Sequence, residues 1–199
     1  LDMAGVNYSS EGIIVDDALR TSNSRIYAAG DVCMDWKFTH AAEDAARIAV
    51  QNALFLGRRR LSVLTMPWCT YTDPAVAHVG IYEHQASTQD VSVSTYTYHW
   101  RDVDRAIVDG EEDGFVRIHT RKGMGEILGA TIVARNAGDM IGEVTLAMLG
   151  GLGLGTLANV IHPYPTAGDA LRRVAFEYKK TQLTPFLKRL LGVWLKVSE

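Results

Sequence analysis

Hydrophobic positions follow two different periods along the chain, and the change comes at Met66-Pro67. Before this point, apolar residues recur at helical spacing and predict a helix that has Thr39 as its N-cap and ends at Gly57. Two earlier apolar runs, at residues 12–15 and 25–28, predict a hairpin-like pair of short strands. The sequence therefore predicts a small mixed region ahead of a second region with a different pattern.

Beyond Met66-Pro67 the pattern turns to short apolar runs that are typical of strands, followed by two longer runs at helical spacing. These runs predict strands at residues 68–71, 77–79, 91–98, 114–120 and 127–133, and helices at 136–149 and 169–183. Asp109-Gly110 is a predicted turn, and the glycine-rich residues 150–155 predict a turn between helices. Strands followed by helices indicate an α+β domain, an antiparallel sheet with helices on one side.

Composition narrows the class of protein. The chain has 199 residues, 47% hydrophobic and 22% charged, which predicts a folded core and excludes a disordered chain. A net charge of -3 supplies no broad basic field, so nucleic acid is excluded as a general partner. Cys33 and Cys69 form no CxxC pair, and the histidines lack the spacing of metal ligands. We expect a cytoplasmic protein without a metal site.

Three short motifs carry candidate chemistry: residues 26–31, which end in Gly30-Asp31, residues 71–74, and residues 162–169. A carboxylate after a strand and a glycine can meet a sugar or polyol hydroxyl, but Gly-Asp is also an ordinary turn. His162 precedes two prolines on a loop, where a histidine acts either as a general base or as a packing residue. Each motif alone leaves both interpretations open.

In this order and spacing, the motifs resemble the C-terminal part of the pyridine nucleotide-disulfide oxidoreductases, the flavoprotein family of lipoamide dehydrogenase, glutathione reductase and mercuric reductase. The resemblance covers nearly the whole chain up to about residue 182. It implies FAD as cofactor and NAD(P)H as electron donor, with Gly30 and Asp31 at the ribityl chain of FAD. It also implies that a helix beginning at Thr39, His40 and Ala41 faces the flavin, where its N-terminus would stabilise negative charge.

The resemblance departs from lipoamide dehydrogenase at the third motif. His162 matches the first histidine of the family's His-x-His-Pro-Thr pattern, but Tyr164 stands at the catalytic histidine and Asp169 replaces the following glutamate. Tyrosine is a hydrogen-bond donor and a poor base at neutral pH. A tyrosine here is similar to the mercuric-reductase-like branch, although the chain lacks that branch's paired-cysteine tail. The resemblance implies that His162, Tyr164 and Asp169 line the acceptor site of the partner subunit in a homodimer.

The resemblance also implies a division of the chain into parts. We predict the remnant of an FAD-binding domain at residues 1–64, a dimerisation (interface) domain at 65–183 and an amphipathic helix at 184–199. The phosphate-binding GxGxxG turn and the redox CxxxxC are absent from the sequence, so we expect further N-terminal FAD and NAD(P)H domains in the complete enzyme. That enzyme would pass electrons from NAD(P)H through FAD to a disulfide or another acceptor. Two alternatives stay open: a homodimerisation module without activity, and a redox protein that contacts a membrane surface through its last helix.

Overall fold

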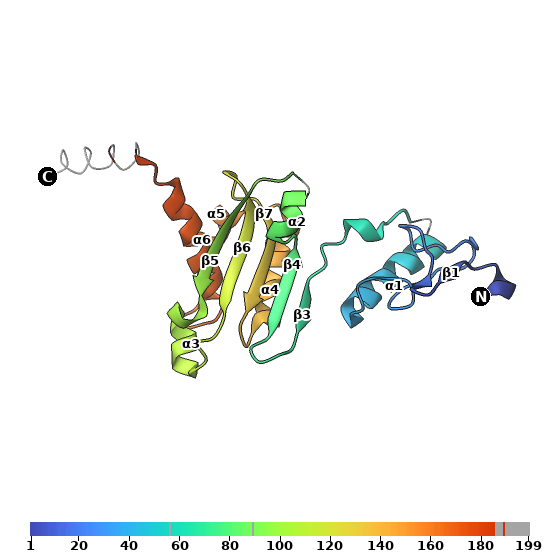
Figure 1. Ribbon diagram of the computed structural model, residues 1–199, viewed down its shortest axis with the longest axis horizontal. Coiled ribbons are helices and arrows are strands. Elements are labelled where there is room, and N and C mark those ends of the chain that lie inside the picture. The colour runs from blue at the N-terminus through green and yellow to red at the C-terminus, as the bar shows by residue number, and fades with distance from the viewer. Residues whose placement is uncertain (56, 89, 186–188, 190–199) are drawn as a thin grey trace. The chain divides into compact units, whose positions relative to one another are not determined.

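The computed structural model describes residues 1–55, 57–88, 90–185 and 189, and it divides into two compact units (Figure 1). Unit 1 comprises Leu1–Met66 and unit 2 comprises Pro67–Glu199. The predicted helix at residues 184–199 falls mostly outside the described residues.

Unit 1 contains one long helix and several short elements. The 3-10 helix η1 spans Asp2–Ala4, the paired strands β1 and β2 span Tyr8–Ser9 and Gly12–Ile13, the helix α1 spans Thr39–Leu54, and the 3-10 helix η2 spans Leu61–Val63. The hairpin predicted from residues 12–15 and 25–28 is wrong, because residues 25–28 contribute just an isolated bridge between Tyr27 and Arg20. The Thr21 hydroxyl donates to the carbonyls of Asn23 and Ile26, so the intervening segment closes as a turn.

The helix α1 supplies most of the core of unit 1. Its buried face packs with the loops before it, and the buried hydrophobic residues are Leu19, Met34, Ala41, Ala45, Ile48 and Ala49. The predicted N-cap is wrong by one residue, since Phe38 occupies that position and Thr39 is the first helical residue. Phe38 has an extended backbone, and its ring stacks on the ring of His40 with centroids 5.5 Å apart. At the N-cap of α1, a contact between two rings thus takes the place of the capping hydroxyl that the sequence predicted.

Unit 2 is built on a five-stranded antiparallel sheet. Its strands are β3 (Trp68–Thr70), β4 (Val76–Gly80), β5 (Val93–His99), β6 (Phe115–Arg121) and β7 (Ile127–Val133), in the order β3-β4-β7-β6-β5. Its helices are α2 (Glu83–Thr88), α3 (Asp104–Asp109), α4 (Ala137–Leu149), α5 (Leu154–Leu157) and α6 (Asp169–Gln182), with the 3-10 helix η3 (Trp100–Asp102) after β5. The predicted α+β class is confirmed.

The helices α4, α5 and α6 lie on one face of this sheet (Figure 1). Because strand side chains alternate between faces, Val79, Ile118 and Ile132 point to the helices and are fully buried. The opposite face carries polar side chains in register, with His78 opposite Thr131 and Thr131 opposite Arg117. The core of unit 2 therefore lies between the sheet and the three helices.

One predicted turn belongs to a helix instead. Asp109 ends α3, and Gly110 follows as its C-cap in the left-handed conformation, with φ 69°. The guanidinium of Arg105 donates to both carboxylate oxygens of Asp109 across one helical turn, at 2.8 and 2.6 Å. The pairing of residues four apart stabilises a helix that six residues alone would not sustain.

Candidate functional site

The Gly30-Asp31 motif lies against the first turn of α1. Gly30 has φ +83°, and a Cβ atom at this position would lie 3.1 Å from Cβ of Ala42. The Gly30 carbonyl accepts the N–H groups of Cys33 and Met34, at 3.0 and 3.1 Å, which closes a tight turn. A glycine is required both by the backbone conformation and by this close approach. The exposed carboxylate of Asp31 follows directly.

The start of α1 has an exposed side and a buried side. Thr39 and His40 are exposed, whereas the Ala41 side chain is fully buried in the core of unit 1. Ala41 can therefore meet a ligand only through its backbone. The first intrahelical bond runs from the Ala42 N–H to the Phe38 carbonyl, so the preceding N–H groups have no intrahelical acceptor. The structure brings the Gly-Asp turn against the first turn of α1, an arrangement that suits hydroxyl and anionic groups.

The second candidate site is the loop between α5 and α6. The hydroxyl of Thr166 donates to the Pro163 carbonyl at 2.7 Å, which closes the loop on itself. The bond between Tyr164 and Pro165 is cis. Tyr164 is 75% exposed, so its phenol projects away from unit 2. The loop thus presents a tyrosine to its surroundings.

His162 pairs with a carboxylate that the sequence did not indicate. Its Nε2 atom lies 3.1 Å from Oε1 and 3.2 Å from Oε2 of Glu143 on α4. The His162 side chain is 8% exposed, and its Nδ1 atom has no hydrogen-bond partner within the described part of the chain. One feature of the sequence could have pointed to Glu143. It is a carboxylate in a predicted helix, directly before residues 144–158, which are almost uncharged.

Asp169 has different partners. Its two carboxylate oxygens accept from Nε of Arg172 at 3.1 Å and from Nε of Arg173 at 2.8 Å, both on its own helix. The carboxylate lies at the N-terminal end of α6, where a negative charge stabilises the helix. Of the three residues expected together, His162 and Tyr164 share the loop, while Asp169 pairs with arginines at the start of α6.

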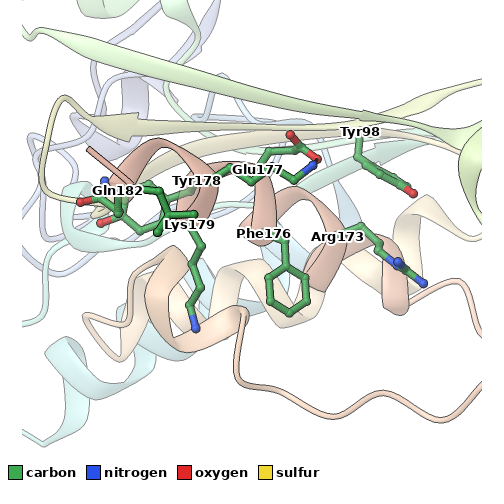
Figure 2. Close-up of a pocket in the computed structure, with 9 residues that line it drawn as sticks. Tyr98, Arg173, Phe176, Glu177, Tyr178, Lys179 and Gln182 are labelled. Carbon is green, nitrogen blue, oxygen red and sulfur yellow. Dashed lines mark hydrogen bonds and ion pairs between the residues drawn. The ribbon is translucent and has the colours of Figure 1, made fainter. Parts of the chain in front are cut away.

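A groove of about 780 Å³ lies beside the C-terminal half of α6 (Figure 2). Tyr98 of β5 and Phe176, Tyr178 and Leu183 form its apolar lining. None of His162, Tyr164 and Asp169 lines it. Within the residues that the structure describes, no helix is both long enough and apolar enough to cross a bilayer.

Comparison with known proteins gives two family matches along the chain. Residues 66–175 match the dimerisation domain of the pyridine nucleotide-disulphide oxidoreductases, and residues 1–46 match the pyridine nucleotide-disulphide oxidoreductase model. A mercuric reductase of Streptomyces lividans is 36% identical over 176 residues, which are 88% of this chain and 37% of that protein. A dihydrolipoyl dehydrogenase of Chlamydia trachomatis is 33% identical over 85% of this chain and 36% of its own length.

Solved structures agree with these matches. The HOCl-induced flavoprotein disulfide reductase RclA of Escherichia coli superposes with a TM-score of 0.81 at 25% identity, over 87% of this chain and 40% of that one. LpdA of Mycobacterium tuberculosis gives a TM-score of 0.80 at 26% identity, over 87% of this chain and 38% of that one. The chain spans between a third and two fifths of the length of these relatives. From the family match over more than half of its residues, the chain belongs to the pyridine nucleotide-disulphide oxidoreductases.

Proposed function

We propose that this chain is part of an FAD-dependent oxidoreductase that takes electrons from NAD(P)H and passes them to a disulfide or another acceptor. Family membership supports this assignment. The observation that carries it is the packing of Gly30 on Ala42, which brings the backbone that precedes the exposed Asp31 against the first turn of α1.

The residues of unit 1 fit a bound FAD. Gly30 allows close approach, the exposed Asp31 carboxylate can accept from a polyol hydroxyl, and the N-terminus of α1 carries a partial positive charge that suits an electron-rich ring. FAD would supply the two-electron chemistry between nicotinamide and acceptor. The task of these residues is to bind the cofactor and orient it.

For the acceptor side, we propose that His162, Tyr164 and Asp169 belong to a site completed by a partner subunit. The exposure of Tyr164 supports this, since its phenol is free to donate a hydrogen bond to a group outside unit 2. Asp169 would act through its arginine pairs, which hold the start of α6. His162 would act from beneath the loop, where its ring is buried.

We further propose a homodimer formed through unit 2. On α4, Leu146 and Leu149 are 67% and 65% exposed, and Ile161 of the neighbouring loop is also exposed. Large apolar side chains that cluster on a surface are typical of protein interfaces. This surface equally favours a second candidate function, a homodimerisation module without activity of its own.

Sedimentation velocity of the 199-residue chain, recorded in the flavin and protein absorption bands after FAD is added, tests the dimer and whether these residues hold flavin by themselves. We expect a dimer at micromolar concentration, and a monomer would contradict the homodimer. Flavin that sediments with the dimer would support the oxidoreductase. A colourless dimer fits both candidates, because the phosphate-binding turn is absent from this sequence, and FAD retention in the complete enzyme then separates them.

Asp31→Asn tests the flavin site in the complete enzyme. Loss of a charge-assisted hydrogen bond to a ribityl hydroxyl is expected to weaken FAD retention by about tenfold or more, measured by equilibrium dialysis. The matched control is Asp35→Asn, which removes a nearby exposed carboxylate. Equal FAD affinity in the two variants would remove Asp31 from the site.

A further inference from the structure

The pair formed by Glu143 and His162 joins two elements that would otherwise meet through apolar contacts. Glu143 lies on α4, and His162 lies on the loop that leads to α6. Since only an N–H can donate to a carboxylate, the imidazole carries a proton on Nε2. The orientation of the imidazole is therefore set by a side chain from a different element.

The same edge of the ring also lies against Gly168, the N-cap of α6. A Cβ atom at Gly168 would lie 2.9 Å from Cδ2 of His162, closer than carbon atoms approach without a shift. The Cδ2–Nε2 edge of the ring is thus enclosed by the carboxylate of Glu143 and by Gly168. With its side chain 8% exposed, His162 has little room for a second rotamer.

The position of Tyr164 depends on this enclosed ring. Tyr164 is two residues beyond His162, on a loop that the Thr166 hydroxyl closes onto the Pro163 carbonyl. The internal bond gives the loop its shape, and the pair with Glu143 ties that shape to α4. Tyr164 itself is 75% exposed and gains little support from its own packing.

We propose that Glu143 is a positioning residue of the acceptor site: its carboxylate fixes His162, and through His162 it fixes the loop that presents Tyr164. This inference rests on the proposed function for its consequence in catalysis, but the positioning is a property of the chain alone. The effect of Glu143 on the reaction passes through the tyrosine.

The first experiment measures the positioning directly, in the 199-residue chain. Nitrogen-15 NMR of the His162 imidazole reports its tautomer, and the ring resonances of Tyr164 report the loop. We expect the Nε2–H tautomer in the original chain and in Glu143→Gln, whose amide oxygen still accepts the bond. Glu143→Leu should give a mixture of tautomers and shifted, averaged Tyr164 resonances. The matched control, Glu126→Gln, removes the charge of an exposed ion pair with Arg121 and should change neither.

Unchanged His162 and Tyr164 signals in a folded Glu143→Leu chain would overturn the proposal. Because Glu143→Gln retains the hydrogen bond, it keeps the test valid even if the leucine variant does not fold. In that case, Glu143→Ala serves as the variant that lacks the hydrogen bond. If the Tyr164 resonances were the same in Glu143→Gln and Glu143→Ala, the hydrogen bond would have no effect on the loop, and the positioning role would be contradicted.

The second experiment is a double-mutant cycle in the complete enzyme, with the two half-reactions measured separately. Glu143→Leu and Tyr164→Phe should each slow acceptor reduction by about tenfold, since misplacing a reacting group by an ångström is costly. Both should leave flavin reduction by NAD(P)H unchanged. If Glu143 acts through Tyr164, the double variant is no slower than Tyr164→Phe alone.

Additive losses in this cycle would contradict the positioning role. Should Tyr164→Phe have no effect on acceptor reduction, the proposed acceptor site would fail while the NMR result on the loop would still stand. The two outcomes are therefore distinguishable.

Discussion

On one face of the five-stranded sheet, Val79, Ile118 and Ile132 lie buried under α4 and α6, whereas the other face carries His78, Thr131 and Arg117 in register. The first face is stabilised by apolar surface removed from water. The second depends on hydrogen bonds between strands, such as the 2.9 Å contact between Nδ1 of His78 and the Thr131 hydroxyl.

The polar face is nevertheless buried at its histidines. His78 and His119 are 2% and 4% exposed, and the His78 ring stacks on Tyr82 with centroids 3.7 Å apart. Buried imidazoles need partners, which Thr131 and the Gly80 carbonyl supply to His78, and Thr95 supplies to His119. A substitution on the helix-covered face therefore lowers stability through the loss of buried side-chain volume. A substitution on the polar face lowers it by leaving buried polar groups without hydrogen bonds.

The largest expected effect is on the helix-covered face. Ile132→Ala removes a fully buried side chain of β7 and should lower the free energy of unfolding by about 2–5 kcal/mol. Urea unfolding followed by circular dichroism measures this. A loss below that of the polar-face variant described next would contradict the comparison.

An intermediate effect is expected on the polar face. Thr131→Val keeps the shape of the side chain but leaves Nδ1 of His78 buried without its partner, which should cost about 1–3 kcal/mol. Thr131→Ser retains the hydroxyl and serves as the control in the same urea experiment. If serine and valine destabilise equally, volume matters on this face as well.

The smallest expected effect is a pH dependence of stability. Burial lowers the pKa of His78, against a bond to the Gly80 carbonyl and assisted by the nearby His119. Burial also lowers the pKa of His119, with Glu83 opposing and Arg117 assisting. The unfolded chain then takes up protons near pH 6.5, while the folded chain does so only at lower pH. The free energy of unfolding should therefore fall as the pH decreases below about 7.

Urea titrations at pH 7.5 and 5.5 check this sign. His119→Gln should reduce the difference between the two pH values, and substitution of the exposed His99 should leave it unchanged. If the chain became more stable on acidification, the pKa values of its histidines would be higher in the folded than in the unfolded state. That result would contradict the prediction.

Much of unit 2 was predictable from the sequence. The strands at residues 68–71, 77–79, 91–98, 114–120 and 127–133 agree with β3 to β7 to within two residues at each end, because an antiparallel sheet with one covered face leaves an alternating pattern. The short helices α2 and α3 were missed, since six residues carry too little periodicity to be recognised.

The two candidate sites also differed in how far the sequence could predict them. Gly30-Asp31 and the start of α1 are close in sequence, and the family resemblance placed both at the flavin; the structure packs Gly30 on Ala42 of α1. Glu143 and His162 are 19 residues apart, with α5 between them, and the sequence offered Asp169 as the nearer carboxylate. Asp169 pairs instead with arginines three and four residues along its own helix, because those positions share a helix face.

The sequence by itself determined the order of the elements, the α+β class and the family, since each depends on periods and motifs within short stretches of chain. The tertiary structure decided which carboxylate holds His162, which face of the sheet buries its histidines and how far Tyr164 projects. Those outcomes depend on side chains from separate elements meeting at hydrogen-bond distance, and local sequence does not encode the distance between elements.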